Sequence, residues 1–398
     1  MAMLSIPYIR FNKFDNEWFP KKLDLVSKVT MGQSPDSKNY TDNPNDYILV
    51  QGNADMKNGR VVPRVWTTQI TKLAEKGDLI LSVRAPVGDV GKTDYNVVLG
   101  RGVAAIKGNE FLFQLLTKMK QSHYWSKFST GSTFESINSN DIKSAEIYLP
   151  SIEEQSAIGS LFYTLDDLLA SYKDNLANYQ SLKTTMLSKM FPKAGEAVPE
   201  IRLDGFKSEW EINKLNKYLT VSKQKNTQLK FDKEDVLSVS GEFGIINQIQ
   251  FQGRSFAGAS VEMYSIVDTG NIVYTKSPLK ANPYGIIKTN YGIPGIVSTL
   301  YAVYLPNENV FPGFVERYFE NDLRLNSYLK PLVNKGAKND MKVSDENALL
   351  GAVIFPQLEE QVAISDYFTN LDKFIQSHKD KISQLETLKK KLLQDMFI

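Results

Sequence analysis

Cysteine is absent from the 398-residue chain, and only two histidines, His123 and His378, occur. Without thiols the protein can form neither disulfides nor thiolate metal sites. Two histidines are too few for a multi-histidine metal centre, and a Ser-His-Asp triad would have to rest on one of them. The absence of cysteine fits an intracellular protein, which we expect to be cytoplasmic.

Long apolar runs are also missing. No segment approaches the roughly 18 apolar residues of a membrane span, and the first residues, MAMLSIPYIRFNKF, lack the apolar core of a signal peptide. A hydrophobic content of 42% and a charged content of 23% are typical of a soluble globular protein. The net charge of +2 does not by itself indicate a nucleic-acid partner, although the surplus of positive charge lies mainly in residues 1–150.

The sequence contains three fragments of catalytic or nucleotide-binding motifs, and each lacks a residue that its motif requires. Residues 88–93, Gly-Asp-Val-Gly-Lys-Thr, resemble the end of a phosphate-binding loop, but Pro86 stands where its first glycine belongs. Gly100-Arg101-Gly102 is too short to be a dinucleotide-binding fingerprint. Asn282-Pro283-Tyr284 lacks one proline of the Asn-Pro-Pro-Tyr motif of amino-methyltransferases. The sequence therefore predicts a chain without catalytic activity of its own.

A long segment occurs twice. Residues 150–191 read PSIEEQSAIGSLFYTLDDLLASYKDNLANYQSLKTTMLSKMF, and residues 356–397 read PQLEEQVAISDYFTNLDKFIQSHKDKISQLETLKKKLLQDMF. The two align without a gap and share about 17 identities. The repeat extends upstream, because Pro7, Ile9, Arg10, Phe14, Glu17 and Trp18 match Pro199, Ile201, Arg202, Phe206, Glu209 and Trp210. Each half thus begins with an opening segment and ends with Met-Phe.

Both halves predict the same mixed domain between the opening segment and the repeated helix. Alternating and β-branched runs bounded by turn residues predict strands, and longer periodic runs predict one helix in each half. The predicted strands are 47–50, 60–66, 78–83, 96–100 and 146–150, then 235–240, 244–251, 264–275, 299–306 and 351–356; the predicted helices are 111–127 and 312–333. Matching turns at 77–80 and 270–273, and polar loops at 131–134 and 336–339, support a shared scaffold with different loops.

The repeated helices carry one apolar stripe each, at steps of three and four residues. The stripes are Ile158, Leu161, Leu165, Leu168, Tyr172, Leu176, Tyr179, Leu182, Met186 and Met190, and Ile364, Tyr367, Leu371, Phe374, His378, Ile382, Leu385, Leu388, Leu392 and Met396. Such a narrow stripe is typical of a two-helix coiled coil. Two copies of one domain–helix unit pack most simply about a pseudo-two-fold axis, which makes the helices antiparallel. His378 lies in the stripe, where a structural role is expected.

The doubled helix opening, Pro-x-hydrophobic-Glu-Glu-Gln-x-Ala-Ile with a Leu-Asp pair downstream, resembles the DNA specificity subunit of Type I restriction–modification systems. The resemblance covers essentially the whole chain and implies an α+β fold. It implies target recognition domains at 1–149 and 192–355, joined by a central helix at 150–191 and a distal helix at 356–398 that act as a spacer.

The same resemblance implies a non-catalytic, DNA-binding function. Each domain would read one half of a bipartite, non-palindromic site in double-stranded DNA, while the helices dock two methyltransferase subunits. Restriction subunits, which carry the motor and nuclease, would join for cleavage. No cofactor is expected on this chain, because S-adenosylmethionine, ATP and Mg²⁺ would be bound by the partner subunits.

Candidate contact residues follow from chemistry, since Arg, Lys, Asn and Gln reach base edges and Ser, Thr and Lys serve phosphates. The candidates are Gln33, Ser34, Asn53, Lys57, Arg60, Arg64, Arg84, Ser132 and Thr133 in the first half, and Lys223, Lys225, Arg254, Lys276, Lys280, Lys335, Lys338 and Asn339 in the second. The helix openings, Glu153, Glu154, Gln155, Glu359, Glu360 and Gln361, either complement the helix dipole or contact a partner subunit.

Two other functions fit the same pattern. One is a non-catalytic scaffold whose helices space two protein-binding domains. The other is the recognition subunit of a related two-subunit restriction enzyme. DNA affinity that falls steeply with salt would separate the leading hypothesis from the scaffold, because phosphate contacts release counterions.

The repeat generates a first prediction. A fragment of residues 1–191 should dimerise through its helix and, together with a methyltransferase subunit, recognise a palindromic site built from the first half-site. Sedimentation of the fragment and sequencing of the modified DNA would check this. A strictly monomeric fragment would contradict it.

Overall fold

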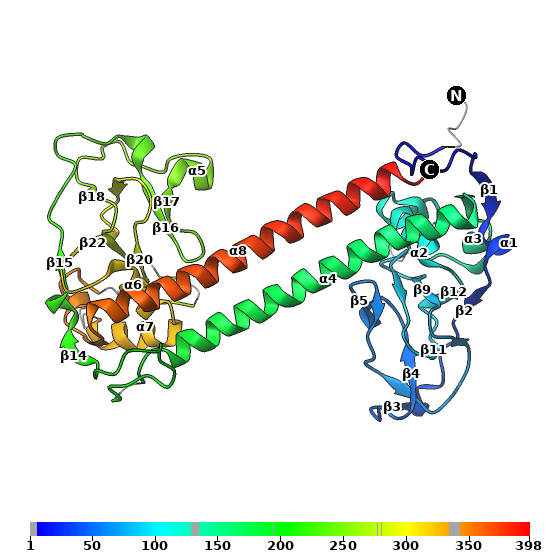
Figure 1. The fold of residues 1–398 in the computed structure, drawn as a ribbon, viewed down its shortest axis with the longest axis horizontal. Coiled ribbons are helices and arrows are strands. Elements are labelled where there is room, and N and C mark those ends of the chain that lie inside the picture. Colours follow the sequence, from blue (N-terminus) through cyan, green and yellow to red (C-terminus); the bar gives the residue numbers. More distant parts are fainter. Residues whose placement is uncertain (1–5, 129–134, 194, 277, 280, 334–342) are drawn as a thin grey trace. The chain divides into compact units, whose positions relative to one another are not determined.

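The computed structural model describes residues 6–128, 135–193, 195–276, 278–279, 281–333 and 343–398. The chain forms two compact units: the first comprises Met1–Asp174 with Lys379–Ile398, and the second Asn175–His378. Two long helices, α4 (Ile152–Lys189) and α8 (Leu358–Asp395), each contribute to both units (Figure 1). Among the described residues no helix is long and apolar enough to cross a membrane.

Unit 1 is built on two sheets. One has the strand order β2 (Val29–Met31), β12 (Val103–Ile106), β9 (Leu79–Ser82), β10 (Val90–Lys92), β6 (Arg60–Val61) and β5 (Met56–Lys57). The other has the order β3 (Tyr40–Thr41), β7 (Trp66–Thr67), β4 (Tyr47–Val50), β11 (Val97–Leu99) and β8 (Leu73–Ala74). β1 (Phe19–Lys22) pairs with β13 (Glu146–Leu149), and the helices are α1 (Leu23–Val26), α2 (Glu110–Gln121) and α3 (Ser139–Lys143).

Unit 2 has a four-stranded sheet in the order β15 (Leu219–Val221), β22 (Tyr301–Pro306), β19 (Ile272–Thr275) and β20 (Ile286–Thr289). Three antiparallel pairs accompany it: β16 (Leu237–Ser240) with β17 (Gly244–Asn247), β18 (Ser265–Val267) with β21 (Gly295–Val297), and β14 (Glu211–Lys214) with β23 (Ala352–Phe355). Its short helices are α5 (Gln248–Gln252), α6 (Pro312–Phe319) and α7 (Asp322–Leu329).

The fold class is the predicted one, a mixed α/β domain in each unit and two long helices, although five predicted elements were wrong in extent. The predicted strand 60–66 is two strands, β6 and β7, and the predicted strand 264–275 is two strands, β18 and β19. The predicted strand 244–251 becomes helix α5 after Asn247, whose side chain accepts hydrogen bonds from two backbone N–H groups of that helix. The predicted helix 312–333 breaks at Asn321, which caps α7 in the same way. The predicted helix 111–127 leaves α-helical geometry after Gln121 and continues as a 3-10 turn.

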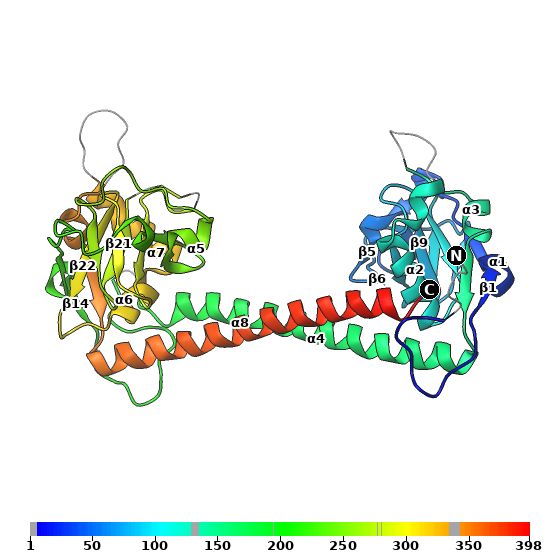
Figure 2. The ribbon, with the colours of Figure 1, turned by 90° about the horizontal axis from the view of Figure 1, so that it is seen from above.

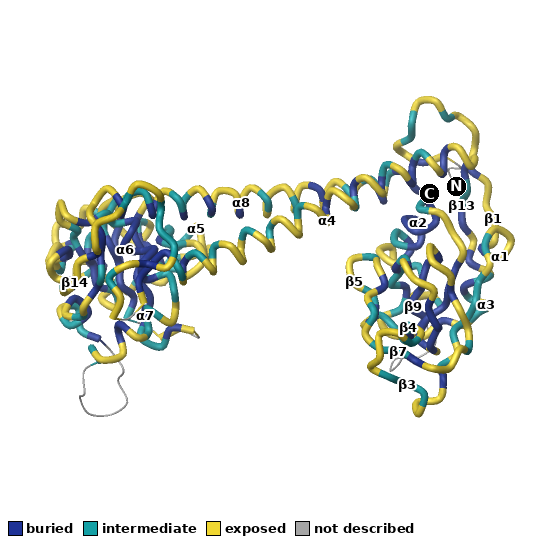
Figure 3. Tube along the Cα trace, turned by 60° about the horizontal axis from the view of Figure 1, so that its bottom comes forward, coloured by how far each residue is buried: buried dark blue, intermediate teal, exposed yellow. Residues whose placement is uncertain are grey.

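Equivalent strands in the two units can be matched by their hydrogen-bond register. Gly77 and Gly270, the glycines of the two predicted turns, have φ values of 93° and 87° and lie two residues before the first residues of β9 and β19. In both units the strand that follows the turn pairs antiparallel with two neighbours, β10 and β12 in unit 1 and β20 and β22 in unit 2. Most residues of these central strands are buried, as their continuous apolar runs require (Figure 3).

The seam of the long helices follows a strict heptad pattern and omits eight positions of the predicted stripes, which are 158, 161, 168, 182, 364, 367, 374 and 388. Of these, Leu168, Leu182, Phe374 and Leu388 are exposed, and the residue that follows each of them lies in the seam instead. The less exposed positions lie at matched places in the two helices: 162, 165, 169, 172, 176, 179, 183, 186 and 190 in α4, and 368, 371, 375, 378, 382, 385, 389, 392 and 396 in α8.

Contacts within each unit show that the helices run antiparallel. In unit 1, Lys173 of α4 pairs with Glu386 of α8 at 2.7 Å. In unit 2, the ring of Tyr179 stacks on Phe374, with centroids 5.9 Å apart, and meets the edge of His378. His378 also bonds the carbonyl of Phe374, which confirms its expected structural role.

The last phenylalanine of each long helix completes the core of the unit that it enters. In unit 1, Phe397 packs against Trp18 of the opening segment, Phe111 of α2 and Phe162 of α4, with ring centroids 5.0–6.4 Å apart. All four side chains are at most 3% exposed. The terminal Met-Phe that the sequence repeats is therefore a core element.

Unit 2 contains the same cluster, built from the other repeat. Phe191, at the end of α4, packs against Trp210, Phe314 of α6 and Phe368 of α8, with centroids 5.7–6.2 Å apart. We call these two clusters, of Trp18, Phe111, Phe162 and Phe397 and of Trp210, Phe314, Phe368 and Phe191, the aromatic joints. Each joint fixes the end of one long helix to the beginning of the other.

The opening segments close the same joints with polar contacts. The N–H of Ile9 donates to the carbonyl of Asp395 at 2.8 Å, and the N–H of Ile201 donates to that of Lys189 at 3.0 Å. Each bond satisfies a carbonyl in the last turn of a long helix, where intrahelical partners run out.

Charged groups lock the joint of unit 2. Lys183 pairs with Asp372 and with Glu320, the residue that follows α6, and Arg317 pairs with both carboxylates, at 2.5–2.8 Å. Burial of Arg317 opposes its charged form, but the two carboxylates outweigh this and raise its pKa above its ordinary value. Burial likewise opposes ionisation of Glu320, while Arg317 and Lys183 prevail and lower its pKa. Lys183 lies in the heptad seam of α4 and needs its carboxylate partner on α8. Such a polar residue in a seam specifies the register in which the two helices pair.

Unit 1 contains an equivalent of the Lys183–Asp372 pair, and a neutral residue, Gln114, bonds to it there. Lys389, equivalent to Lys183, pairs with Asp166, which also accepts a hydrogen bond of 2.8 Å from Gln114. The Lys–Asp pair thus holds the antiparallel register in both units, while its support from the domain helix differs.

The aromatic joint generates a second prediction. Phe397→Ala should destabilise unit 1 by about 3–5 kcal/mol, the usual effect of deleting a buried ring. Hydrogen exchange of β9 and β12 would measure the change, with β19 and β22 as the reference for unit 2. Leu168→Ala, at an exposed seam-flanking position, is the matched control and should change stability by less than about 0.5 kcal/mol. Unchanged protection of β9 in the Phe397 variant would contradict the prediction.

Candidate nucleic-acid interface

Three predicted contact residues of unit 1 converge on one cleft. Ser34, Asn53 and Arg84 line a cavity of about 250 Å³ at the ends of β4, β9 and β11. The cleft also contains Gln51 and Arg101, which sequence reasoning did not nominate. We call Ser34, Gln51, Asn53, Arg84 and Arg101 the strand-end cluster. Its lining contains guanidinium, amide and hydroxyl groups and no carboxylate.

The backbone on either side of Arg101 packs closely against Gln51, and glycines make this approach possible. A Cβ on Gly102 would lie 2.1 Å from the carbonyl oxygen of Gln51, and a Cβ on Gly100 would lie 3.0 Å from the Cα of Gln51. Only glycine permits so close an approach. The Gly100-Arg101-Gly102 triplet, which is too short for a dinucleotide-binding fingerprint, therefore allows close backbone packing. It was the feature of the sequence that could have pointed to Arg101.

Hydrogen bonds fix the rest of the cleft floor. The N–H of Arg101 donates to Oγ of Ser34 at 3.1 Å, and Oγ of Ser82 donates to the carbonyl of Arg84 at 2.9 Å. The buried carboxylate of Asp55 accepts from the N–H groups of Gln51 and Gly52. Side chains on such a floor are well placed to meet a ligand without reorganisation.

The other candidates of unit 1 lie outside this cleft. Gln33 is exposed, and its backbone bonds Leu99 and Thr71. Lys57 is exposed on β5, while Arg60 pairs with Asp94 at 2.7 Å and Arg64 donates to the carbonyl of Ala54 at 2.8 Å. The candidates Ser132 and Thr133 lie outside the described residues.

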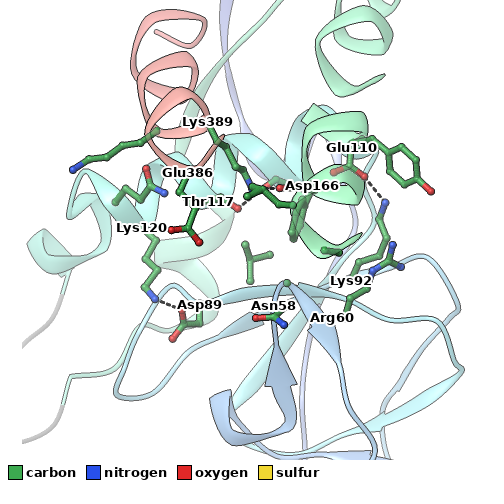
Figure 4. A pocket seen from close by; sticks show the side chains of 18 of the residues that line it. Asn58, Arg60, Asp89, Lys92, Glu110, Thr117, Lys120, Asp166, Glu386 and Lys389 are labelled. Atoms are coloured by element: carbon green, nitrogen blue, oxygen red, sulfur yellow. Dashed lines mark hydrogen bonds and ion pairs between the residues drawn. The ribbon is translucent and has the colours of Figure 1, made fainter. Parts of the chain in front are cut away.

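A larger cavity of unit 1, about 860 Å³, is lined by ion-paired side chains (Figure 4). Arg60 lines it together with residues of β10, α2, α4 and α8. Lys92, the lysine of the incomplete phosphate-loop motif, pairs there with Glu110 at 2.5 Å, and Lys120 pairs with Asp89. The carboxylates of Glu110 and Asp89 neutralise these two lysines, so neither lysine contributes an unpaired positive charge to the cavity.

Candidates of unit 2 are more dispersed. Lys223 is exposed. Lys225 donates to Oγ of Ser265 at 2.8 Å, and Lys276 pairs with Asp345 at 2.9 Å, so both ammonium groups have partners inside the unit. Arg254 is exposed and lies over the ring of Phe256, 4.5 Å from its centroid. The candidates Lys280, Lys335, Lys338 and Asn339 lie outside the described residues.

The helix openings serve mainly inside each unit. Glu154 accepts two hydrogen bonds of 2.6 Å from Arg10, and Glu360 accepts two of 2.7 Å from Arg202. These bonds raise the pKa of each arginine, since they stabilise its charged form. The repeated opening segment is thus tied to the repeated helix by a bidentate ion pair in both units.

Gln155 and Gln361 are buried as well. Gln155 accepts from Nδ2 of Asn109 and donates to the carbonyl of Pro150, and Gln361 accepts from the N–H of Phe311. The middle and last residues of both Glu-Glu-Gln triplets are buried and bond to groups of their own unit, while the partner contact of the triplets stays a prediction. The exposed members, Glu153 and Glu359, are the ones that a partner could reach.

Residues 15–179 match the family described as the Type I restriction modification DNA specificity domain. The match covers the scaffold of unit 1, the strand-end cluster and most of α4.

Curated relatives include two specificity subunits of Methanocaldococcus jannaschii. The protein named type I restriction enzyme MjaX specificity subunit is 35% identical over 148 residues, covering 36% of this chain and 34% of that protein. The type I restriction enzyme MjaIX specificity subunit is 24% identical over 234 residues, 54% of each chain. The matched parts thus span about a third and about half of the lengths of these relatives.

A solved structure supports the fold over the full length. The S subunit of a Type-I restriction-modification system from M. genitalium superposes with a TM-score of 0.61 at 17% identity, covering 99% of each chain. At that identity the likeness concerns the fold, which pairs two α/β domains with two long helices. The likeness in fold therefore covers both units, beyond the residues that the family model matches.

The glycine platform generates a third prediction. Gly102→Ala should destabilise unit 1 by about 1–3 kcal/mol, because the new methyl group collides with the Gln51 carbonyl. Gly52→Ala is the matched control in the same cleft, since a Cβ there meets nothing within 4 Å. Urea denaturation of both variants would check this. Equal midpoints for the two variants would show that the platform is not rigid.

Proposed function

We propose that this chain is the DNA-recognition subunit of a Type I restriction–modification complex. The observation that carries the proposal is the family match of residues 15–179, together with a second unit built on the same register and closed by the same aromatic joint. Two readers on one scaffold suit a bipartite DNA site, each unit contacting one half-site.

The division of labour within the chain follows from that proposal. The regions 1–149 and 192–355 act as target recognition domains, and the helices at 150–191 and 356–398 set the gap between the half-sites and dock two methyltransferase subunits. Methylation and ATP-dependent cleavage are carried by the methyltransferase and restriction subunits, which bind S-adenosylmethionine, ATP and Mg²⁺. The long helices, drawn in Figure 2 as α4 and α8, support this role. The heptad seam occupies one face of each helix, and most of the other residues within 170–185 and 376–391 are exposed.

The two half-sites should differ, which makes the full site non-palindromic. Register matching supports this. The N–H of Val83 bonds the carbonyl of Gly102 in unit 1, and the N–H of Lys276 bonds that of Leu300 in unit 2, so the residue equivalent to Arg101 is Thr299. An arginine and a threonine do not read the same base edge.

The fourth prediction tests the function directly. When this chain is co-expressed with its methyltransferase subunit, sequencing of modified bases should reveal one bipartite, asymmetric site. The affinity of the complex for a duplex with that site should fall by orders of magnitude between 50 and 200 mM salt, as phosphate contacts require. A duplex of equal length with a scrambled site is the control. A scaffold protein would show no sequence-selective modification at any salt concentration.

A further inference from the structure

The guanidinium groups of Arg84 and Arg101 differ from every other arginine in the described part of the chain. The chain contains nine arginines. The other seven have protein partners: Arg10, Arg60, Arg64, Arg202, Arg254, Arg317 and Arg324 bond carboxylates or carbonyls, or stack on a ring. Among the described residues, no hydrogen bond or ion pair engages the guanidinium of Arg84 or Arg101. Both line the same cleft.

Among the described residues that line this cleft, none carries a carboxylate. The carboxylate beneath its floor, that of Asp55, accepts from the N–H groups of Gln51 and Gly52. The cleft is completed by the amides of Gln51 and Asn53 and the hydroxyl of Ser34. In the larger cavity of the same unit, by contrast, Lys92, Lys120 and Lys389 each meet a carboxylate. The strand-end cluster therefore presents unused donors to a ligand that is rich in acceptors.

We propose that Arg101, with Arg84 beside it, reads a guanine of the half-site that unit 1 recognises; this rests on the proposed function. A guanidinium presents a planar fork of N–H donors that matches O6 and N7 of guanine in the major groove. The fork must be presented in a fixed orientation. Gly100 and Gly102 let the backbone of Arg101 pack directly on Gln51, and hydrogen bonds from the N–H of Gly100 to Val50 and from the N–H of Arg101 to Ser34 hold it there. A contact to phosphate alone would need the positive charge of Arg101 but not the close packing of Gly100 and Gly102 on Gln51.

The assignment is specific to the first half-site. In unit 2 the equivalents of Gly100, Arg101 and Gly102 are Ser298, Thr299 and Leu300, so both the fork and the glycine platform are missing there. A threonine hydroxyl can reach a base edge but cannot form two parallel bonds to one guanine. Substitution of Arg101 should therefore alter one half of the modified site and leave the other half unchanged.

The test uses the complex of this chain with its methyltransferase subunit. Arg101→Ala should convert one guanine of the first half-site into a position that accepts other bases, with discrimination reduced about 5- to 150-fold, the range for one bidentate pair. Arg101→Lys should relax the same position, because lysine keeps the charge but lacks the fork. The second half-site and the gap should not change. Lys21→Ala, on exposed β1, is the surface-charge control.

A modified duplex keeps the test independent of how well a variant folds. Replacing the guanine with 7-deazaguanine removes the N7 acceptor and preserves base pairing. The native complex should then modify the substituted duplex more slowly, whereas the Arg101→Ala complex should treat both duplexes alike.

Three outcomes have distinct meanings. An unchanged site in the Arg101→Ala complex, or native activity that is indifferent to 7-deazaguanine at every guanine of the first half-site, overturns the guanine assignment. Uniformly weaker modification that Arg101→Lys restores, with the site unaltered, shows a phosphate contact and also overturns it. Absence of sequence-selective modification by the native complex refutes the proposed function itself.

Discussion

The aromatic joints are the interaction on which the rest of the structure depends. Phe397 and Phe191 each end one long helix and enter a core made by the start of the other helix, the domain helix and the opening tryptophan. A buried ring contributes several kcal/mol, and its partners here belong to three segments that are distant in sequence. The chain therefore cannot change the length of either helix without pulling a phenylalanine out of a core. This constraint accounts for the gapless alignment of residues 150–191 with 356–397.

Polar groups add register to that constraint. Lys183 and Lys389 lie in the heptad seam and pair with Asp372 and Asp166, while Arg10 and Arg202 bind Glu154 and Glu360 at the helix starts. A lysine in an apolar seam costs stability unless its carboxylate partner is in place, so shifted pairings are penalised. Unit 2 adds Arg317 and Glu320 to its pair, and unit 1 adds only Gln114. The Lys–Asp pairs of the two units are thus equivalent in position but are supported by different neighbours, which are charged in unit 2 and neutral in unit 1.

Beyond the joints, the two units use one strand scaffold to present different chemistry. The turns at Gly77 and Gly270 and the registers of β9 and β19 agree, whereas the residues at the ends of the neighbouring strands do not. In unit 1 the strand-end cluster combines a closely packed floor with the guanidinium groups of Arg84 and Arg101, which form no hydrogen bond or ion pair within the described part of the chain. A rigid floor lowers the entropy lost on binding, and unpaired donors in a cleft without carboxylates favour an acceptor-rich ligand.

The sequence by itself determined the architecture, because repeats and helical periodicity are local patterns. It revealed the two matching halves, the long helices and most central strands, and it nominated Ser34, Asn53 and Arg84. Only the tertiary structure decided which face of each helix is buried, since Leu168 and Phe374 follow the apolar period yet lie outside the seam. Only the structure showed that Glu154 and Gln155 are used internally and that Arg101 joins Arg84 in one cleft. The physical reason is that burial and ion pairing depend on segments far apart in the chain, whose approach a local pattern does not encode.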